Sequence, residues 1–269
     1  MMPTANLTTT GENSCKNCER PLENDQMFCQ TCGAKVVRNR LTIRNLLVEF
    51  TEKYFNLDNT FLKTFIHLFT RPEIVINSYI SGTRKKYVNV ASYFAITLSL
   101  LGVQYFIFKK FFPGVYDTNF LATEGMETVQ SEIMQTVAEY QSLIMILYIP
   151  VYGIISRIVF FDNKKFNYTE HVVMFMYILS QTSLVSIVFL IIGGITGTFQ
   201  IISFFLLFLQ ILYSAYVLKR VFALNLVGIF ARTMLFLVVG GFFYALAVIG
   251  IVAFLFFNGT LAEVVEAQR

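Results

Sequence analysis

Charge is scarce in this sequence, and its scarcity excludes an ordinary soluble fold. Only 14% of the residues are charged, whereas 55% are hydrophobic, and the 29 Phe outnumber all 21 Lys and Arg. A soluble domain has no need for so much apolar surface. Asp, Glu and Lys are also missing from the middle of every long apolar run. Their absence argues against a proton-coupled pump and against intramembrane hydrolysis, and we predict that the protein is not an enzyme.

Cysteine is missing everywhere except between Cys15 and Cys32. The chain therefore has no thiol for a disulfide in any other region. Residues 1–14 are polar and lack the apolar stretch of a secretory signal, so we predict a disordered N-terminus there and no cleaved leader.

Long apolar runs are what the sequence has in abundance. Each of five runs is long enough to cross a bilayer, because a spanning helix needs about 20 mostly apolar residues. We therefore predict a mainly α-helical, polytopic membrane protein that is embedded in the lipid bilayer as its partner. Its transmembrane domain covers 88–257, with spans at about 88–108, 143–161, 171–195, 199–218 and 233–257.

The cysteines form two Cys-x-x-Cys pairs that are separated by ten residues. Four thiolates at this spacing can close a tetrahedron around Zn²⁺, and a segment as short as 15–37 has too small a core to fold without such a staple. A pair of disulfides is the alternative, which a reducing cytoplasm disfavours. We predict a zinc ribbon with the metal ligands Cys15, Cys18, Cys29 and Cys32.

A zinc ion with four protein ligands has no open coordination position, so its role is structural rather than catalytic. The basic residues around the ribbon make only a modest positive surface, which disfavours nucleic acid as a partner. We predict a protein partner for the ribbon. Association with further copies of the chain is an alternative.

Residues 38–87 have the helical spacing of a cytoplasmic amphipathic neck. Apolar residues recur at helical intervals from Leu41, again from Asn59 as a helix N-cap, and again from Pro72 to Gly82. These helices are too polar to span, so they either lie on the cytoplasmic leaflet or pack on the membrane domain. The single His67 in the neck is expected to be packed or solvated rather than a ligand.

Residues 15–89 resemble a family of uncharacterised bacterial membrane proteins, the domain of unknown function 3667. The resemblance rests on the cysteine pairs with Phe28, then on Arg40-Leu41-Thr42, Phe61-Leu62-x-Thr64, Arg71-Pro72, and Tyr79-Ile80-x-Gly82-x-Arg84-x-x-Tyr87-x-Asn89. Glu19 departs from the family pattern, where Gly often follows the first cysteine pair, and Val90 replaces a frequent Pro. The resemblance implies a bacterial inner membrane and brings no assigned activity or substrate.

Basic residues predict the orientation of the chain in the membrane. They cluster on alternate sides of successive spans, at Arg84–Lys86, at Lys164 and Lys165, and at Lys219, Arg220 and Arg232. The positive-inside rule places these clusters and the N-terminus in the cytoplasm. A helix is expected at the outer surface around 126–140, and the tail 258–269 is predicted to be extracytoplasmic.

Several single residues inside the spans lead to further predictions. Pro150 should kink the second span, Arg157 should extend to the cytoplasmic surface, and Glu170-His171 should form an interfacial cap or a proton-sensitive pair. Small residues of the fifth span, from Gly240 to Gly250, indicate close helix packing. The polar residues that could hydrogen-bond between helices or line a pathway are Gln104, Ser180, Gln181, Thr182, Ser183, Gln200, Gln210 and Ser214.

Two hypotheses about function follow. The first is an inner-membrane protein whose zinc ribbon is a cytoplasmic protein-interaction module anchored by five helices. The second is a transporter or channel for a small or lipidic solute, built around Gln181 and Pro150. Convergence of the polar span residues on one water-accessible cavity would favour the second hypothesis.

Overall fold

The computed structural model describes residues 14–23, 26–36, 42, 60–116 and 127–257. The chain forms two compact units, Met1–Asn56 and Leu57–Arg269, and each is described by itself. The predicted disordered start (apart from Ser14), the amphipathic helix from Leu41, the Asn59 cap and the tail 258–269 all lie outside the described residues.

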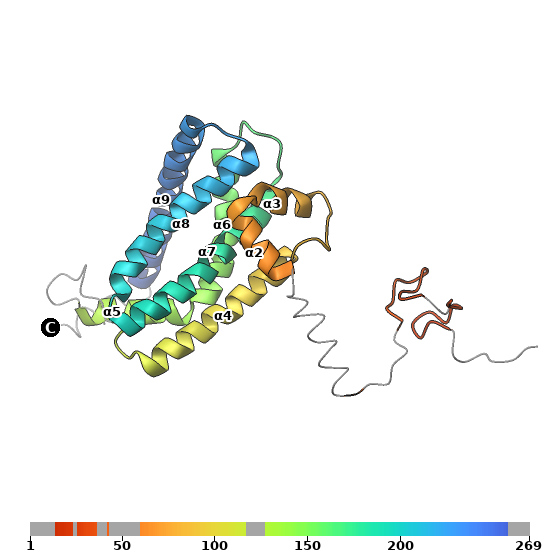
Figure 1. The fold of residues 1–269 in the computed structure, drawn as a ribbon. Coiled ribbons are helices and arrows are strands. Elements are labelled where there is room, and N and C mark those ends of the chain that lie inside the picture. Colours follow the sequence, from red (N-terminus) through yellow and green to blue (C-terminus); the bar gives the residue numbers. More distant parts are fainter. Residues whose placement is uncertain (1–13, 24–25, 37–41, 43–59, 117–126, 258–269) are drawn as a thin grey trace, which may run out of the picture. The chain divides into compact units, whose positions relative to one another are not determined.

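The described part of the second unit is helical throughout, as predicted. Its helices are α2 (Thr60–Thr70), α3 (Pro72–Ile80), α4 (Val90–Phe111), α5 (Glu127–Glu139), α6 (Gln141–Val159), α7 (Tyr168–Thr196), α8 (Phe199–Phe222) and α9 (Leu226–Phe257) (Figure 1). Five of them, α4 and α6 to α9, are long and apolar enough to cross a membrane. The five-span, mainly helical fold class is therefore confirmed.

Three of the spanning helices, α4, α7 and α9, begin beside an asparagine whose side chain caps the first turn. Asn89 accepts a hydrogen bond from the Ala91 amide at the start of α4. Asn167 and Glu170 form a capping box at the start of α7, and Asn225 accepts from the Gly228 amide before α9. Because such caps satisfy exposed amides of the first turn, α7 and α9 begin several residues earlier than hydropathy predicts.

One end of the bundle gathers the basic clusters, and we call it the basic end. There α4, α7 and α9 begin and α6 and α8 end. The Arg232 guanidinium donates to the Asp162 carboxylate, with N–O distances of 2.9 and 2.6 Å. Arg220 forms an equally bidentate pair with the Glu73 carboxylate, with N–O distances of 3.0 and 2.6 Å. The two ion pairs join α9 to the α6–α7 loop and α8 to α3.

Helices α2 and α3 pack on the spanning helices, which settles the alternatives for this part of the neck. The α2 backbone accepts hydrogen bonds from Gln181 of α7 and Tyr213 of α8. At 1.5 Å per residue, these side chains lie about 20 Å and about 14 Å from the ends of their helices. The short helices are therefore set well into the bundle and do not lie across its end (Figure 1).

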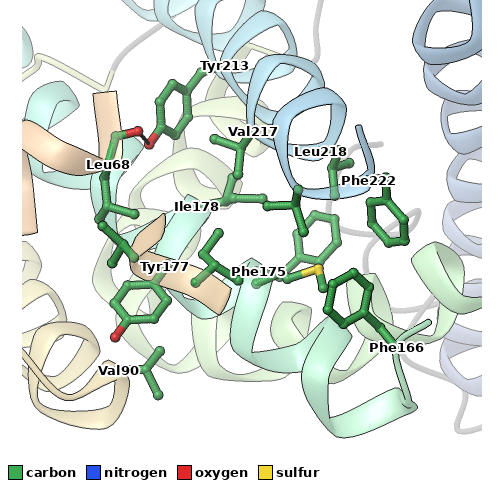
Figure 2. Close-up of a cluster of buried hydrophobic side chains, with 14 of the residues drawn as sticks. Leu68, Val90, Phe166, Phe175, Tyr177, Ile178, Tyr213, Val217, Leu218 and Phe222 are labelled. Atoms are coloured by element: carbon green, nitrogen blue, oxygen red, sulfur yellow. Dashed lines mark hydrogen bonds between the residues drawn. The ribbon is translucent and has the colours of Figure 1, made fainter. Parts of the chain in front are cut away.

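The main core lies where α2 and α3 meet α4, α6, α7 and α8. Its buried side chains include Leu68 and Val75 from the short helices and Tyr177, Ile178 and Val217 from the spans. Figure 2 shows these layers, with Ile178 between the α8 side chains and Tyr177. Within a bilayer such contacts stabilise through close packing and not through exclusion of water.

Helices α6 and α7 pack closely at Gly153 in α6, where a Cβ would stand 2.8 Å from the Val172 side chain of α7. The prediction that the glycines of the fifth span mark close packing is wrong where it can be checked. A Cβ at Gly240 would meet only one atom, at 3.9 Å, and none lies within 4 Å at Gly241. The absence of a side chain therefore permits close packing at Gly153 in α6, whereas Gly240 and Gly241 in α9 have no such close contact.

The helix predicted around 126–140 is confirmed by α5 (Glu127–Glu139). The Tyr105 hydroxyl of α4 donates to the carboxylate of Glu139, the last residue of α5. The Gln141 side-chain amide donates to the Leu101 carbonyl of α4. These bonds hold the α5–α6 corner against α4, at the end of the bundle opposite the basic end.

Candidate functional sites: four cysteines and the buried polar residues

The two cysteine pairs are built as two copies of one backbone loop. In the first loop the Cys15 amide donates to the Arg20 carbonyl and the Glu19 amide to the Cys15 carbonyl, at 2.8 and 2.7 Å. In the second loop the Cys29 amide donates to the Ala34 carbonyl and the Gly33 amide to the Cys29 carbonyl, both at 2.8 Å. Isolated bridges close both loops, between Ser14 and Pro21 and between Phe28 and Lys35. The repeat turns both pairs of thiols toward one point.

The four sulfur atoms lie within 4.8 Å of one another and could hold a metal ion. Cys15 Sγ is 3.6 Å from Cys32 Sγ, and Cys18 Sγ is 3.6 Å from Cys29 Sγ. A disulfide would require about 2.05 Å, and all four thiols are free. Ligands about 2.3 Å from a tetrahedral zinc ion lie roughly 3.8 Å apart, so the observed spacing fits that geometry.

The thiols of the cluster differ in acidity. The Asn17 side chain and then the Ala34 backbone lower the pKa of Cys32 to about 6. At Cys18 the Arg20 backbone lowers the pKa, but the thiol of Cys32, burial and the other thiols outweigh it and raise the pKa to about 12. Four thiolates this close therefore repel one another unless a cation lies among them.

Glu19 and Gly33 occupy equivalent positions after the two cysteine pairs. Both have left-handed backbones, with φ of 61° at Glu19 and 70° at Gly33. A side chain in this conformation costs about 1 kcal/mol relative to glycine, which explains the frequent Gly at the position of Glu19.

Gln181 is the centre of the polar contacts within the bundle. Its side chain is fully buried, accepts from the Tyr93 hydroxyl of α4, and donates to the Phe65 carbonyl of α2 at 3.0 Å. One turn away, the Tyr177 hydroxyl donates to the Val88 carbonyl at 2.9 Å. Gln181 thus joins three helices and lines no pathway there.

Two tyrosines of α8 satisfy the backbone where α2 stops. Pro72 has no N–H, so it cannot complete the helical bond to the Leu68 carbonyl four residues earlier. The Tyr213 hydroxyl donates to that carbonyl at 3.0 Å, shown as a dashed line in Figure 2, and Tyr216 donates to the Phe69 carbonyl at 2.9 Å. Sequence reasoning missed both contacts because each joins residues far apart in the chain.

The residues that carry the family resemblance hold this region together. Thr64 is buried and accepts from the Val88 amide at 3.0 Å. His67 is packed, with its Nδ1 2.8 Å from the Tyr87 hydroxyl. Gly82 has a φ of 97° after α3, and the Arg84 guanidinium lies over the Tyr79 ring. These contacts connect α2, α3 and the start of α4 into one local structure.

A buried Ser–His pair lies near the basic end and was not foreseen from the sequence. Ser156 Oγ of α6 is 2.8 Å from His171 Nδ1 of α7, and both side chains are fully buried. The His171 ring lies beside Phe160 and Phe222. Glu170 caps α7 as predicted, whereas His171 turns inward, so the two do not form a proton-sensitive pair.

Arg157 is partly exposed, so the prediction that it extends to the surface is confirmed only in part. Its Nη1 atom is buried and lacks a hydrogen-bond partner among the described residues, as do His171 Nε2 and Ser180 Oγ. Pro150 lies within the continuous helix α6, and its carbonyl accepts from the Tyr168 hydroxyl at 3.3 Å.

The polar span residues do not converge on one cavity in the described part of the chain. Gln181 is enclosed by its partners, Gln210 and Ser214 line a cavity between α6, α7, α8 and α9, and Gln200 lines a recess at the opposite end from the basic end. This separation is what a bundle joined by interhelical hydrogen bonds would show.

Comparison with known proteins supports the resemblance found in the sequence. Residues 58–102 match the family model described as "Protein of unknown function (DUF3667)". The match covers α2, α3 and the first half of α4, and it does not reach the four cysteines. No curated protein and no solved structure matches the chain.

Proposed function

We propose that the protein is a non-enzymatic component of the bacterial inner membrane that presents a zinc ribbon to a protein partner in the cytoplasm. The observation that carries the proposal is the cluster of four free thiols within 4.8 Å at the end of two matched loops. Zn²⁺ bound by all four would have no open position for a substrate, so its role is to fold the ribbon.

Two exposed apolar side chains give the ribbon a contact surface. Met27 and Phe28 are 75% and 54% exposed, directly before the third cysteine. Aromatic side chains and Met are enriched at protein interfaces relative to the rest of the protein surface. The modest charge of the ribbon supports a protein partner over nucleic acid.

The geometry supports an anchor more than an enzyme or a channel. Ser156 and His171 could in principle form a nucleophile and base, but both are fully buried, and no cavity described above reaches them. The separation of Gln181, Gln200 and Gln210 likewise supports a sealed bundle over a polar pathway.

The zinc role is tested by Cys29→Ser in the full chain. We expect the wild type to hold one Zn²⁺ per chain, with thiolate charge-transfer absorption after cobalt substitution. Zinc contributes on the order of 10 kcal/mol to folding of such small units, so the variant should lose the metal and the ribbon fold. It should still insert, because the spans do not need the metal.

The partner role is tested separately by Met27→Asp with Phe28→Asp. This variant keeps all four ligands and should retain zinc while losing proteins that crosslink to the wild-type ribbon in native membranes. Glu19→Gly is the matched control, since it keeps the loop conformation, the metal and the partner. A Cys29→Ser variant that keeps every crosslinked partner would reject the interaction role.

Orientation is tested with reporter fusions at positions that the five-span topology separates. A reporter at Asn163 should be cytoplasmic, and one after Arg269 should be extracytoplasmic. A cytoplasmic reporter after Arg269 would contradict this arrangement of spans.

A further inference from the structure

A narrow cavity runs between α6, α7, α8 and α9 toward the basic end, and we call it the lateral slot. Its volume is about 110 Å³. On α8 its lining extends from Gln210 to Leu218, and on α9 from Ile229 to Leu237. At 1.5 Å per residue, the slot is about 12 Å long. This elongated shape suits a chain better than a compact ring system.

The lining is mainly apolar, and the slot lies among helices that could all span the membrane. Phe175, Leu179 and Leu218 contribute buried surface from α7 and α8; Phe175 and Leu218 are labelled in Figure 2. On the other side, α9 leaves most of its surface exposed, with only 6% of its apolar stretch buried. The slot is also partly open to its surroundings, so a lipid chain can reach it.

Volume decides what the slot can hold. Pockets for drug-sized ligands measure roughly 300–1,000 Å³, so the lateral slot is too small for a large solute. A cavity of about 150 Å³ with a similar apolar lining stays dry and binds a small hydrocarbon. A short length of one hydrocarbon chain fits both the volume and the lining.

The Arg232 guanidinium lies at the basic end of the slot, where it is paired with Asp162. It donates to the Val159 carbonyl and the Asp162 carboxylate and lies 4.8 Å from the centre of the Phe160 ring. These bonds use three of the five guanidinium N–H groups. The other two can donate to an acidic headgroup, in the way that arginine binds phosphate.

We propose that the lateral slot binds one acyl chain of a membrane phospholipid, with the lipid phosphate at Arg232. The acyl chain replaces empty space between α8 and α9 with van der Waals contacts, and the lipid headgroup stays at the polar edge of the bilayer. The lipid thereby joins the thinly packed α9 to the rest of the bundle.

The test uses the full chain in cell membranes that contain phospholipids with a photoactivatable diazirine in the acyl chain. After illumination, labelled residues are mapped by mass spectrometry. We expect label on the buried residues Phe175, Leu179 and Leu218, in addition to exposed residues such as Phe208 and Val238, which contact bulk lipid in any case. Label on the exposed residues alone would overturn the proposal.

A filling substitution supplies the matched comparison. Ala215 lines the slot, and Ala215→Phe should remove at least nine-tenths of the label from Phe175 and Leu179 while Phe208 keeps its label. Ala245→Phe makes the same change at an exposed position of α9 and should leave all labelling unchanged. Persistent inner labelling in Ala215→Phe would show that the chain lies elsewhere and would overturn the assignment to the slot.

Native mass spectrometry of the purified protein identifies the class of ligand. A bound phospholipid that is several-fold depleted in both Ala215→Phe and Arg232→Gln, but not in Ala245→Phe, is the expected result. A free fatty acid in place of phospholipid would overturn the headgroup assignment, and detergent alone would overturn lipid binding. None of these results depends on the zinc ribbon or its partner.

Discussion

Helices α7 and α9 are similar in length and hydropathy but differ in what surrounds them. In α7, 33% of the most apolar stretch is buried, against 6% in the described part of α9. Buried polar groups, among them His171, Ser180 and Gln181, lie along α7, whereas the polar contacts of α9 gather at Arg232 near its start. Hydropathy therefore shows which helices can enter a bilayer, and buried polar groups show which helix the others are arranged around.

The sharpest test of this comparison makes the same substitution in both helices. Ile178 of α7 is fully buried, and Ile249 of α9 is 64% exposed. Ile178→Ala should lower the free energy of unfolding by about 2–5 kcal/mol, because it leaves a cavity in the core. Ile249→Ala should change it by less than about 0.5 kcal/mol. The measurement is the fraction of detergent-purified protein that stays monodisperse after heating, and equal losses would contradict the comparison.

A second, smaller effect is expected from the hydrogen bonds of α7. Gln181→Leu removes bonds to Tyr93 and to the Phe65 carbonyl and should cost about 1–3 kcal/mol. Gln210→Leu, which changes the same residue type beside α9, should cost less. In the double variant with Tyr93→Phe, the second substitution should add little to Gln181→Leu. Additive losses would show that the two side chains act independently.

The smallest effect concerns the ion pair that joins α3 to α8. The hydrogen bond from Arg220 lowers the pKa of Glu73 below its ordinary value of 4.5. A lowered folded-state pKa means that the pair stabilises the protein above pH 4.5 and stops doing so as the pH falls through the folded-state value. Arg220 is 44% exposed, so solvent screens the pair and its contribution to stability is small.

The control for this pH dependence is Glu73→Gln, which cannot titrate. The difference in thermal stability between wild type and variant should shrink as the pH is lowered below 4.5. A difference that stays constant would show that the Glu73 carboxylate does not stabilise the contact through its charge.

The sequence predicts the features that depend on local pattern. Five apolar runs became five helices, and two Cys-x-x-Cys pairs became one cluster, because hydropathy and cysteine spacing are properties of neighbouring residues. Pro72 and Gly82 likewise marked the limits of α3, since each restricts or frees its own backbone.

Contacts between distant residues were not predictable in the same way. Tyr213 and Leu68 are 145 positions apart, and Arg220 and Glu73 are 147 apart. Hydropathy says nothing about the rotation of a helix about its axis. That rotation buries the Nη1 atom of Arg157, brings Ser156 to His171, and places Gly153 against the Val172 side chain.

The tyrosine bonds to the end of α2 constrain the order in which the protein can be assembled. A ribosome completes Leu68 and Pro72 long before it reaches Tyr213 and Tyr216. Until α8 enters the membrane, the Leu68 carbonyl has neither a helical donor nor its tyrosine, and an unpaired carbonyl in hydrocarbon is costly. The α2–α3 segment must therefore wait at the membrane surface and reach its final place only after the fourth span arrives. A cysteine introduced at Leu68, which is fully buried in the structure, should accordingly remain open to water-soluble reagents in chains cut after Thr196 and become protected in the full chain.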